Sequence, residues 1–386
     1  MAYDANRKIR VLVVDDSRVI RAIIADSIAG SPVMEVAGTA ADGRQALEAA
    51  ASLHPDVVTL DVQMPNMDGL ATLDALVQRH AVPVVMVSSL TQRGAEATLD
   101  ALERGAVDYV AKPDGTGGAR QALGDELLRK IHNAAGADVQ RLLRIRRERK
   151  LRLAVPPRDV PARVIPPAAM AQLSRACIAI GISTGGPPAL TRLFSALRPP
   201  LPPIVVVQHM PPQFTKPLAW RLDSLSELSI QEAAGGEELR PNQVLIAPGG
   251  RHVEIRRHGA GAKATVNDGL PVSGHKPSVD VMMKSVAETF GPRTLGVIMT
   301  GMGHDGVDGC RAIRAAGGVV LGQDEATSEV YGMNKAAHLQ GCVDLQFSLE
   351  KGAAAIAAHA QRLLAPADAA PPSARYAHTI DLDGFH

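Results

Sequence analysis

The sequence predicts two α/β domains, each built on a mainly parallel sheet. The chain has 386 residues, which is more than one ordinary domain core usually contains. Short aliphatic runs alternate with amphipathic stretches of helical length from residue 9 to about 134, and again from about 175 to 364. Alternation of this kind favours βαβ units. The hydrophobic fraction of 46% is enough for two cores.

The first domain is expected to contain five parallel strands. The apolar runs are Ile9–Val14, Val33–Ala37, Val57–Leu60, Val84–Val87 and Val107–Val110. Amphipathic stretches such as Arg18–Ala29 and Ala95–Arg104 predict the helices that connect them. Five such strands favour a doubly wound sheet in the order 2-1-3-4-5, whose switch point lies at the ends of strands one and three.

Polar side chains follow these strands where each one ends. Asp15 and Asp16 follow the first strand, and Asp61 follows the third. Carboxylates that meet at one edge repel each other, and Mg²⁺, which prefers oxygen ligands, would relieve that repulsion. Ser88 ends the fourth strand and Lys112 follows the fifth, so both can stabilise charge on a phosphoryl group. A single Asp after a strand is usually a helix N-cap, but the whole set indicates a phosphorylation site.

This set resembles the bacterial response-regulator receiver domain, a flavodoxin-like fold, over residues 8–134. The resemblance implies that Asp61 is the phosphoacceptor and that a sensor histidine kinase is the phosphodonor. It implies that Mg²⁺ is held by Asp16, Asp61 and the backbone carbonyl of Gln63, with Asp15 supporting it through water. Ser88, Tyr109 and Lys112 would respond to the phosphoryl group.

Residues 138–172 are expected to form a linker, basic at first and then rich in proline. The basic run could bind nucleic acid or an anionic surface. However, Glu148 interrupts it and aromatic residues for base stacking are missing, so a solvated helical extension is favoured. The tail, residues 366–386, is expected to be disordered.

In the second domain, three strand-like runs each lead to a residue suited to acyl transfer. Ser183 follows Cys177–Ile182, His209 follows Ile204–Gln208, and Asp305 comes soon after Leu295–Met299. Since parallel strands bring their carboxyl ends to one edge, a nucleophile, a base and an orienting carboxylate can converge there.

The serine lies in a pattern typical of a nucleophile elbow, Gly181-x-Ser183-x-Gly185. The predicted helix Pro187–Leu197 would bring free backbone N–H groups close to its hydroxyl. Taken alone the signal is weak, because serine is a common N-cap. The order Ser, His, Asp also differs from that of standard α/β-hydrolases, although triads are defined by geometry rather than by order.

A rival interpretation concerns residues Gly301–Gly306, which match G-x-G-x-x-G between a strand and the predicted helix Val307–Ala316. A further strand, Val319–Gly322, leads to Asp324, about where a ribose-binding acid would stand. The second domain could therefore be a nucleotide-binding output domain without hydrolytic activity. This alternative gives the serine and the histidine no role, so the residues favour a hydrolase without excluding the alternative.

Residues 174–365 are expected to form the second domain, and over 176–365 the chain resembles the catalytic domain of chemotaxis protein-glutamate methylesterases. The stretches that carry the resemblance are Gly181–Gly186, Gln208–Pro212, Ala247–His252, Pro277–Asp280, Met299–Gly306 and Gln323–Glu325. The sequence departs from the family pattern at Ile182, usually Ala, and at Asn334, usually Pro. Neither is a reacting group.

This resemblance implies a Rossmann-like, mainly parallel α/β fold and a serine hydrolase that is activated by phosphorylation. Ser183 would be the nucleophile, His209 the base and Asp305 the orienting acid, with backbone N–H groups of Met302 and Thr184 as candidates for the oxyanion hole. The implied substrates are glutamyl γ-methyl esters, and in addition glutamines, on the cytoplasmic helices of methyl-accepting chemoreceptors. No metal or cofactor is expected for the hydrolytic step.

The overall composition sets limits on the partners and location expected of the protein. A net charge of +1 argues against a nucleic-acid partner. No apolar run approaches the ~20 residues that a membrane span needs. The 3 cysteines favour buried thiols in a reducing compartment. A strand that begins by Ile9 leaves no room for a signal peptide, so a cytoplasmic protein is expected.

Overall fold

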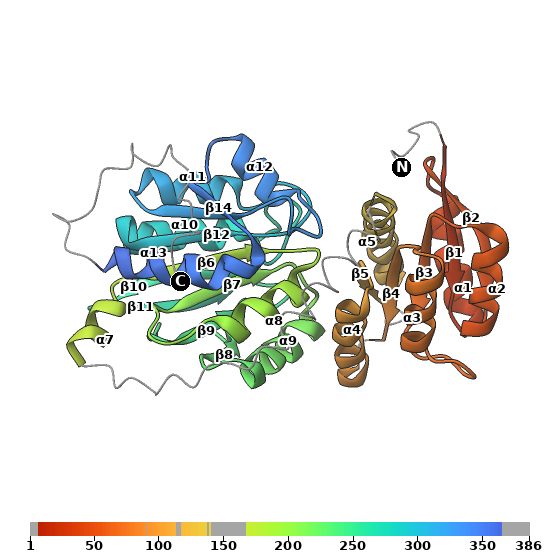
Figure 1. Cartoon of the computed structure of the whole chain (residues 1–386), viewed down its shortest axis with the longest axis horizontal. Coiled ribbons are helices and arrows are strands. Elements are labelled where there is room, and N and C mark those ends of the chain that lie inside the picture. The colour runs from red at the N-terminus through yellow and green to blue at the C-terminus, as the bar shows by residue number, and fades with distance from the viewer. Residues whose placement is uncertain (1–6, 90, 113–116, 137–138, 140–166, 365–386) are drawn as a thin grey trace. The chain divides into compact units, whose positions relative to one another are not determined.

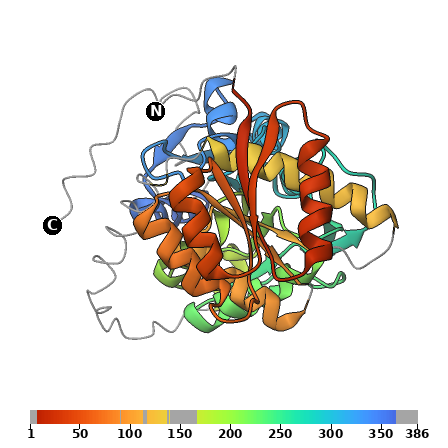
Figure 2. The same cartoon turned by 90° about the vertical axis from the view of Figure 1, so that its right-hand side faces the viewer.

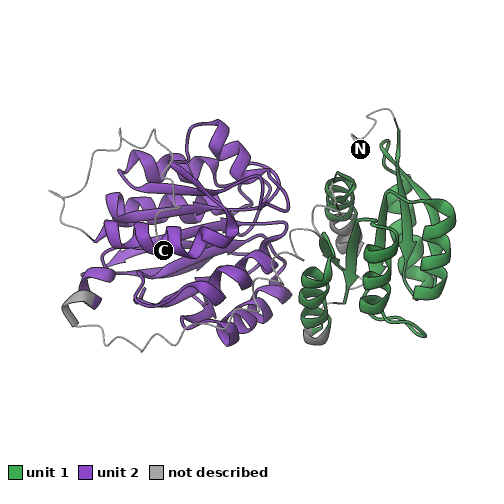
Figure 3. Cartoon of the chain, in the orientation of Figure 1, with its two compact units in different colours: residues 1–160 green, residues 161–386 purple. Residues whose placement is uncertain are grey.

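The computed structural model of the chain describes residues 7–89, 91–112, 117–136, 139 and 167–364 (Figure 1). Two compact units are present, residues 1–160 and 161–386 (Figure 3). Residues 140–166 of the expected linker and the expected disordered tail, 366–386, lie outside the described residues. The end of the expected linker forms helix α7, Pro167–Leu173. Among the described residues, no helix combines the length and apolar character needed to span a membrane.

The first unit contains a five-stranded parallel sheet in the order β2-β1-β3-β4-β5. Its strands are β1 (Ile9–Val14), β2 (Met34–Ala40), β3 (Val57–Asp61), β4 (Val84–Ser88) and β5 (Asp108–Ala111). The predicted strand order is confirmed, and strand bounds differ from the predicted ones by a few residues at most. Strands β3 and β4 are buried along their whole length, and their residues are apolar except for Thr59, Asp61 and Ser88.

Helices cover both faces of this sheet (Figure 2). They are α1 (Arg18–Ala29), α2 (Gly43–Leu53), α3 (Gly69–Arg79), α4 (Gln92–Arg104) and α5 (Gly117–Ala135). Helix α1 contacts α5, whereas α3 contacts both α2 and α4. Local sequence fixes where helices begin: the side chains of Asp42, Asp68 and Thr91 each accept a backbone N–H in the first turn.

The second unit contains a seven-stranded parallel sheet in the order β14-β13-β12-β6-β7-β9-β8. Its strands are β6 (Cys177–Ile182), β7 (Ile204–Gln208), β8 (Ser229–Glu232), β9 (Gln243–Ile246), β12 (Thr294–Ile298), β13 (Val319–Gln323) and β14 (Leu345–Phe347). An antiparallel hairpin, β10 (His252–His258) and β11 (Gly261–Asn267), forms a separate small sheet. The expectation of a mainly parallel α/β fold is therefore confirmed.

The helices of this unit are α8 (Gly186–Ala196), α9 (Pro212–Leu225), α10 (Val279–Phe290), α11 (Val307–Ala315), α12 (Met333–Leu339) and α13 (Gly352–Leu363). Two 3₁₀ turns are formed by Gly291–Arg293 and Leu349–Lys351. Helix α10 is central to the packing because it contacts β6, the strand β10 of the hairpin, and α11. Its buried side chains join those of the hairpin and β6 in one apolar core.

Candidate functional site

The three predicted reacting groups of the second unit follow neighbouring strands. In the sheet β6 lies between β12 and β7, with Gly181 opposite Ile298 and Ile182 opposite Gln208. The chain continues this pairing past the strand ends, because Ser183 N donates to Thr300 O at 3.0 Å. The serine, the histidine and the loop that carries the acid therefore emerge at one edge of the sheet.

The turn after β6 holds Ser183 tightly and leaves it 9% exposed. Gly185 adopts a φ of 76°, in the left-handed region that favours glycine, and the chain then enters α8. The backbone of Gly301 approaches closely, since a Cβ there would lie 2.7 Å from Ser183 Cβ and 2.5 Å from Met333 Sδ. Glycine is needed at 301 to let the acid-bearing loop pass this near to the serine.

The His209 imidazole binds the Asp305 carboxylate, with 2.8 Å between Nε2 and Oδ2. Asp305 is fully buried and its oxygens also accept hydrogen bonds from Ser278 Oγ (2.8 Å), Val279 N (2.8 Å) and Asp280 N (3.0 Å). Burial raises the pKa of this carboxyl, but the hydrogen bonds from His209 and the backbone outweigh it and lower the pKa to about 2. Asp305 is therefore ionised at neutral pH.

An ionised Asp305 fixes the tautomer of the neutral His209 ring, because only a protonated Nε2 can donate to the carboxylate. The other ring nitrogen, Nδ1, is then the basic one. It is buried and has no hydrogen-bond partner among the described residues. Nδ1 is thus available to accept a proton at the edge where Ser183 lies.

A second carboxylate, Asp280, lies close to Asp305, and its pKa is shifted in the opposite direction. Its Oδ1 accepts hydrogen bonds from Gly306 N (3.0 Å) and Gly309 N (2.7 Å). Burial, reinforced by the nearby Asp305 charge, raises the pKa of Asp280 to about 6 in spite of these bonds. The two acids share one buried region but differ in the pH range over which they ionise.

These two pKa shifts predict opposite effects of pH on stability. Asp305 stabilises the fold above its unfolded pKa near 3.8, and this contribution is lost as the pH falls toward 2. The Asp280 contribution is fully present below about pH 3.8 and is lost as the pH rises through 6. Urea unfolding from pH 2 to 7 should therefore show that Asp280→Asn becomes more stable relative to wild type as the pH rises from 4 to 6. A difference that stays constant over this range would contradict the assignment.

The two oxyanion-hole candidates lie beside the serine in different loops. Thr184 directly follows Ser183, and its carbonyl accepts a hydrogen bond from Thr300 Oγ1 at 3.0 Å. Met302 directly follows Gly301, whose backbone packs closely against Ser183. The Thr300 and Gly301 backbone therefore packs against Ser183 and Thr184.

The predicted acids of the first unit meet at the carboxyl ends of β1 and β3. Asp15, Asp16 and Asp61 each place one carboxylate oxygen within 4.8 Å of the others. Asp15 and Asp61 are buried, while Asp16 is exposed and lines a pocket together with Gln63. A set of hard oxygen donors that opens to a pocket fits a divalent cation such as Mg²⁺. The Gln63 backbone N–H also donates to Asp61 Oδ1 at 3.3 Å.

Lys112 joins this acidic cluster directly. Its ammonium lies 2.9 Å from Asp15 Oδ2 and 2.8 Å from Asp61 Oδ2. Burial raises the pKa of Asp61 and the Asp15 charge raises it further, whereas the Lys112 hydrogen bond partly opposes both. The pKa of Lys112 is raised in turn, since the two carboxylates outweigh its burial. The lysine is therefore a fixed positive charge beside Asp61.

The other two predicted switch residues are buried on neighbouring strands. Ser88 Oγ donates to the Gly94 carbonyl at 3.1 Å, so its hydroxyl bonds to helix α4. Tyr109 on β5 is buried, and the Lys130 ammonium lies 4.5 Å from the centre of its ring. Burial, together with the Asp108 charge, raises the pKa of the Tyr109 phenol well above its usual range. A change at Asp61 would have to reach Tyr109 through these strands.

Three residues that contact the proposed triad were not predicted as site residues from the sequence. Ser278, Asp280 and the neighbouring His275 all belong to the chain segment before or at the start of α10. The stretch Pro277–Asp280 contributed to the family resemblance, yet a serine before a helix looks like an ordinary N-cap. Ser278 is indeed the N-cap of α10, since its Oγ accepts the Val281 N–H, and it binds Asp305 as well.

The alternative of a dinucleotide-binding loop is not supported. In the loop formed by residues 301–306, the Asp305 carboxylate is engaged by His209 and by the start of α10. A Cβ at Gly306 would lie 2.7 Å from Val279 Cγ1 and 2.8 Å from Ile298 Cδ1, so this glycine serves side-chain packing. The loop therefore positions the Asp305 carboxylate, rather than presenting its backbone N–H groups to a pyrophosphate.

The fold and the sites define a response-regulator receiver joined to an α/β domain with a histidine–carboxylate pair. Family models match both parts: Response regulator receiver domain over residues 11–123 and CheB methylesterase over residues 178–356. The chain belongs to the protein-glutamate methylesterase/protein-glutamine glutaminase family.

Two relatives align with most of the chain, and one solved structure aligns with about half of it. The protein-glutamate methylesterase/protein-glutamine glutaminase of Pyrococcus abyssi is 43% identical over 347 residues, 89% of this chain and 92% of the relative. Its namesake numbered 4 from Anaeromyxobacter dehalogenans is 44% identical over 348 residues, 89% of this chain and 93% of the relative. The crystal structure of the Thermotoga maritima CheB methylesterase catalytic domain is 38% identical, covers 49% of this chain and 97% of that one, and gives a TM-score of 0.46.

Proposed function

We propose that this protein hydrolyses glutamyl γ-methyl esters on the cytoplasmic domains of methyl-accepting chemoreceptors, and that it also deamidates receptor glutamines. The observation that carries the chemistry is the hydrogen bond between His209 and the buried Asp305, 2.8 Å long, at the sheet edge where Ser183 emerges. Family membership supports the substrate class. The proposed site of action is the cytoplasm, where the receptor helices are accessible.

In the proposed mechanism Ser183 Oγ attacks the ester carbonyl while its proton passes to His209 Nδ1. Ionised Asp305 holds the proton on Nε2 and stabilises the imidazolium that forms. The imidazolium then gives its proton to the leaving methoxide oxygen, and methanol departs. Water attacks the resulting acyl-enzyme with His209 again as base, which restores the serine and leaves a glutamate. A glutamine would follow the same route and release ammonia.

The negative charge that develops on the carbonyl oxygen needs donors close to Ser183. The backbone N–H groups of Met302 and Thr184 are the proposed donors, because Thr184 directly follows Ser183 and Met302 directly follows Gly301, which packs against the serine. Loss of one such donor typically costs ~2.7–4 kcal/mol in the transition state. The hydrolytic step, as proposed, uses only groups of the chain itself.

We further propose that phosphorylation of Asp61 by a sensor histidine kinase controls this hydrolase. Asp15, Asp16, Asp61 and the Gln63 carbonyl would hold Mg²⁺, which would neutralise phosphoryl charge during the transfer. Lys112, already beside Asp61, would pair with the new phosphoryl oxygens. Ser88 and Tyr109 would carry the change to the receiver surface.

The proposed domain limits follow from these assignments. The receiver would occupy residues 8–134, the basic and then proline-rich linker 138–172, and the catalytic domain 174–365, followed by the tail 366–386. The two compact units and the two matching family models are compatible with this division.

The regulatory proposal predicts that Asp61→Asn will remove stimulation without removing catalysis. Methanol release from methylated receptor membranes would be measured with and without a small phosphodonor plus Mg²⁺. Wild type should be stimulated, whereas Asp61→Asn should keep its unstimulated rate under both conditions. Asp74→Asn, which changes a partly exposed acid of α3 paired with Arg104, is the matched control and should be stimulated like wild type. Stimulation of Asp61→Asn would rule out Asp61 as the phosphoacceptor.

A further inference from the structure

We propose that His252, a buried histidine outside the triad, is a positioning residue that holds both neighbours of the catalytic imidazole in place. This inference rests on the proposed roles of Ser183, His209 and Asp305. His252 begins strand β10 and is 2% exposed, so solvent does not satisfy its ring nitrogens. Each nitrogen bonds to the backbone instead.

The two bonds of His252 fix it as a neutral imidazole of one tautomer. Ser278 N donates to Nδ1 at 3.2 Å, so Nδ1 has to carry a lone pair. Nε2 lies 2.9 Å from the Leu270 carbonyl, which can only accept, so Nε2 carries the proton. Together these bonds tie the two ends of the segment 270–278 to one ring.

Through Ser278, His252 is connected to the acid of the triad. Ser278 is the N-cap of α10, and its Oγ donates to Asp305 Oδ1 at 2.8 Å. The next two backbone N–H groups bind the same carboxylate. Moving the start of α10 would therefore move the carboxylate that holds His209 Nε2.

The segment 270–278 also carries the residue that stacks on the catalytic imidazole. Val272 and His275 exchange two backbone hydrogen bonds, of 3.0 and 2.9 Å, which close the segment into a compact turn. The His275 ring then stacks on the His209 ring, with 3.8 Å between centroids and 3° between planes. One buried ring thus supports both the carboxylate partner of His209 and the ring stacked on it.

Such support matters because His209 must keep its direction while it takes and returns a proton. One contact on His209, the His275 ring, belongs to the segment that His252 ties down, and the other, Asp305, is bound by Ser278 at the end of that segment. Truncating His252 to alanine would leave the buried Ser278 N–H without its acceptor and would release the carbonyl of Leu270, a residue that is 86% exposed. A displacement of about 1 Å in a reacting group can cost ~100-fold in rate.

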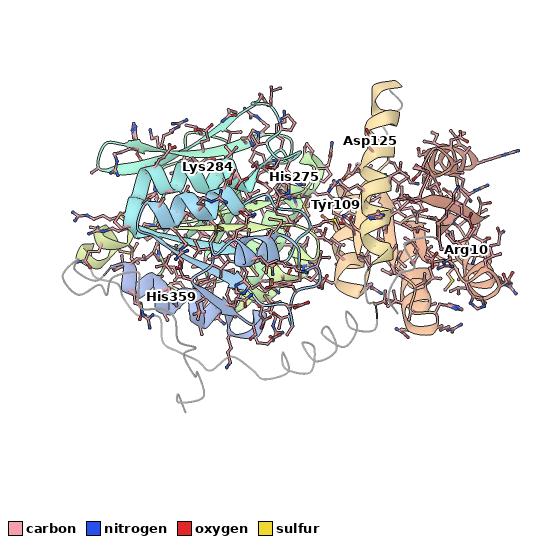
Figure 4. All side chains as sticks on the ribbon, turned by 90° about the horizontal axis from the view of Figure 1, so that it is seen from above. Arg10, Tyr109, Asp125, His275, Lys284 and His359 are labelled. Atoms are coloured by element: carbon pink, nitrogen blue, oxygen red, sulfur yellow. The ribbon has the colours of Figure 1, made fainter. Side chains whose placement is uncertain are left out.

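The test compares three substitutions of His252 in the full-length protein. His252→Ala removes both bonds, His252→Asn can keep an acceptor for Ser278 N–H, and His252→Gln can reach the Leu270 carbonyl. His359→Ala is the matched control, because His359 is also buried and its Nδ1 bonds a carbonyl, that of Ala355, inside α13. Figure 4 shows the side chains of His275 and His359 well apart in this unit.

Two measurements separate positioning from general stability. The first is kcat and KM for methanol release from methylated receptor membranes. The second is the downfield proton resonance of His209 Nε2–H, identified by its loss in His209→Gln and independent of any substrate. We expect His252→Ala to lower kcat about 100-fold with KM little changed, and to weaken the resonance. His252→Asn should keep more activity than His252→Gln, and His359→Ala should match wild type in both measurements.

A folded His252→Ala with wild-type kcat and an unchanged resonance would overturn the proposal. So would loss of folding in all three His252 variants, since the role would then be general structural support. Full methanol release by His209→Gln would instead refute the triad on which the inference rests, so the two failures are distinguishable.

Discussion

Replacing Ser183 with alanine should lower methanol release from methylated receptor membranes by about 10⁶-fold. The serine supplies the bond-forming oxygen, so its loss removes covalent catalysis and leaves His209 and Asp305 without a group to activate. Losses of this order accompany removal of the nucleophile in serine hydrolases. The full-length protein would be measured with phosphodonor present, so that any switch is in its active state.

A matched control for this experiment is Ser195→Ala. Ser195 lies on α8, the helix that follows the nucleophile, and its hydroxyl donates to the nearby Arg192 carbonyl. It should retain the wild-type rate. A serine-directed inhibitor should label wild type and Ser195→Ala but not Ser183→Ala. A Ser183→Ala rate within tenfold of wild type would exclude Ser183 as the nucleophile.

Asp305→Asn should lower kcat by about 10⁴-fold. An asparagine amide can donate to His209 Nε2, which would then have to be the unprotonated nitrogen and would leave the proton on Nδ1. A ring in that tautomer cannot take the proton of Ser183, and a comparable exchange in a serine protease costs ~10⁴ in kcat. The effect should persist across the pH range, because the wrong tautomer is not corrected by raising the pH.

Asp308→Asn is the control for this second substitution. Asp308 lies on the next helix, α11, with its side chain half exposed and paired with Lys284 and Arg311. It should change kcat little. Because Asp305 also binds the start of α10, circular dichroism must show that Asp305→Asn is folded before its rate is compared. A folded Asp305→Asn with a rate within tenfold of wild type would contradict the proposed role of the acid.

Much of the fold could be predicted because periodic apolar runs are long and buried. Strands β1, β3, β4 and β5 of the first sheet and β6, β7, β12 and β13 of the second fall in such runs, whereas β2 is only partly buried. The short strands β8, β9 and β14 were not predicted, and β8 and β14 are buried only in part. The β10–β11 hairpin was also missed, because its strands end in polar, exposed residues.

Within the site, residues that end long strands could be proposed from sequence, whereas their supporting groups could not. Ser183, His209 and Asp61 each follow or end a buried strand, so topology alone brings them to a sheet edge. His252 and His275 have no such position, and their contacts depend on how the segment before α10 turns back. The roles of the reacting groups remain proposals that the substitutions above test.

The attachment of Asp305 to α10 bears on the transfer of this chemistry to other scaffolds. Copying only the serine, the histidine and the acid-bearing loop would leave the carboxylate free to rotate, because its orientation is set by Ser278, Val279 and Asp280 on a different helix. A designer would have to graft the first turn of α10 together with the loop. In this protein the smallest transplantable catalytic unit is therefore a loop plus a helix start.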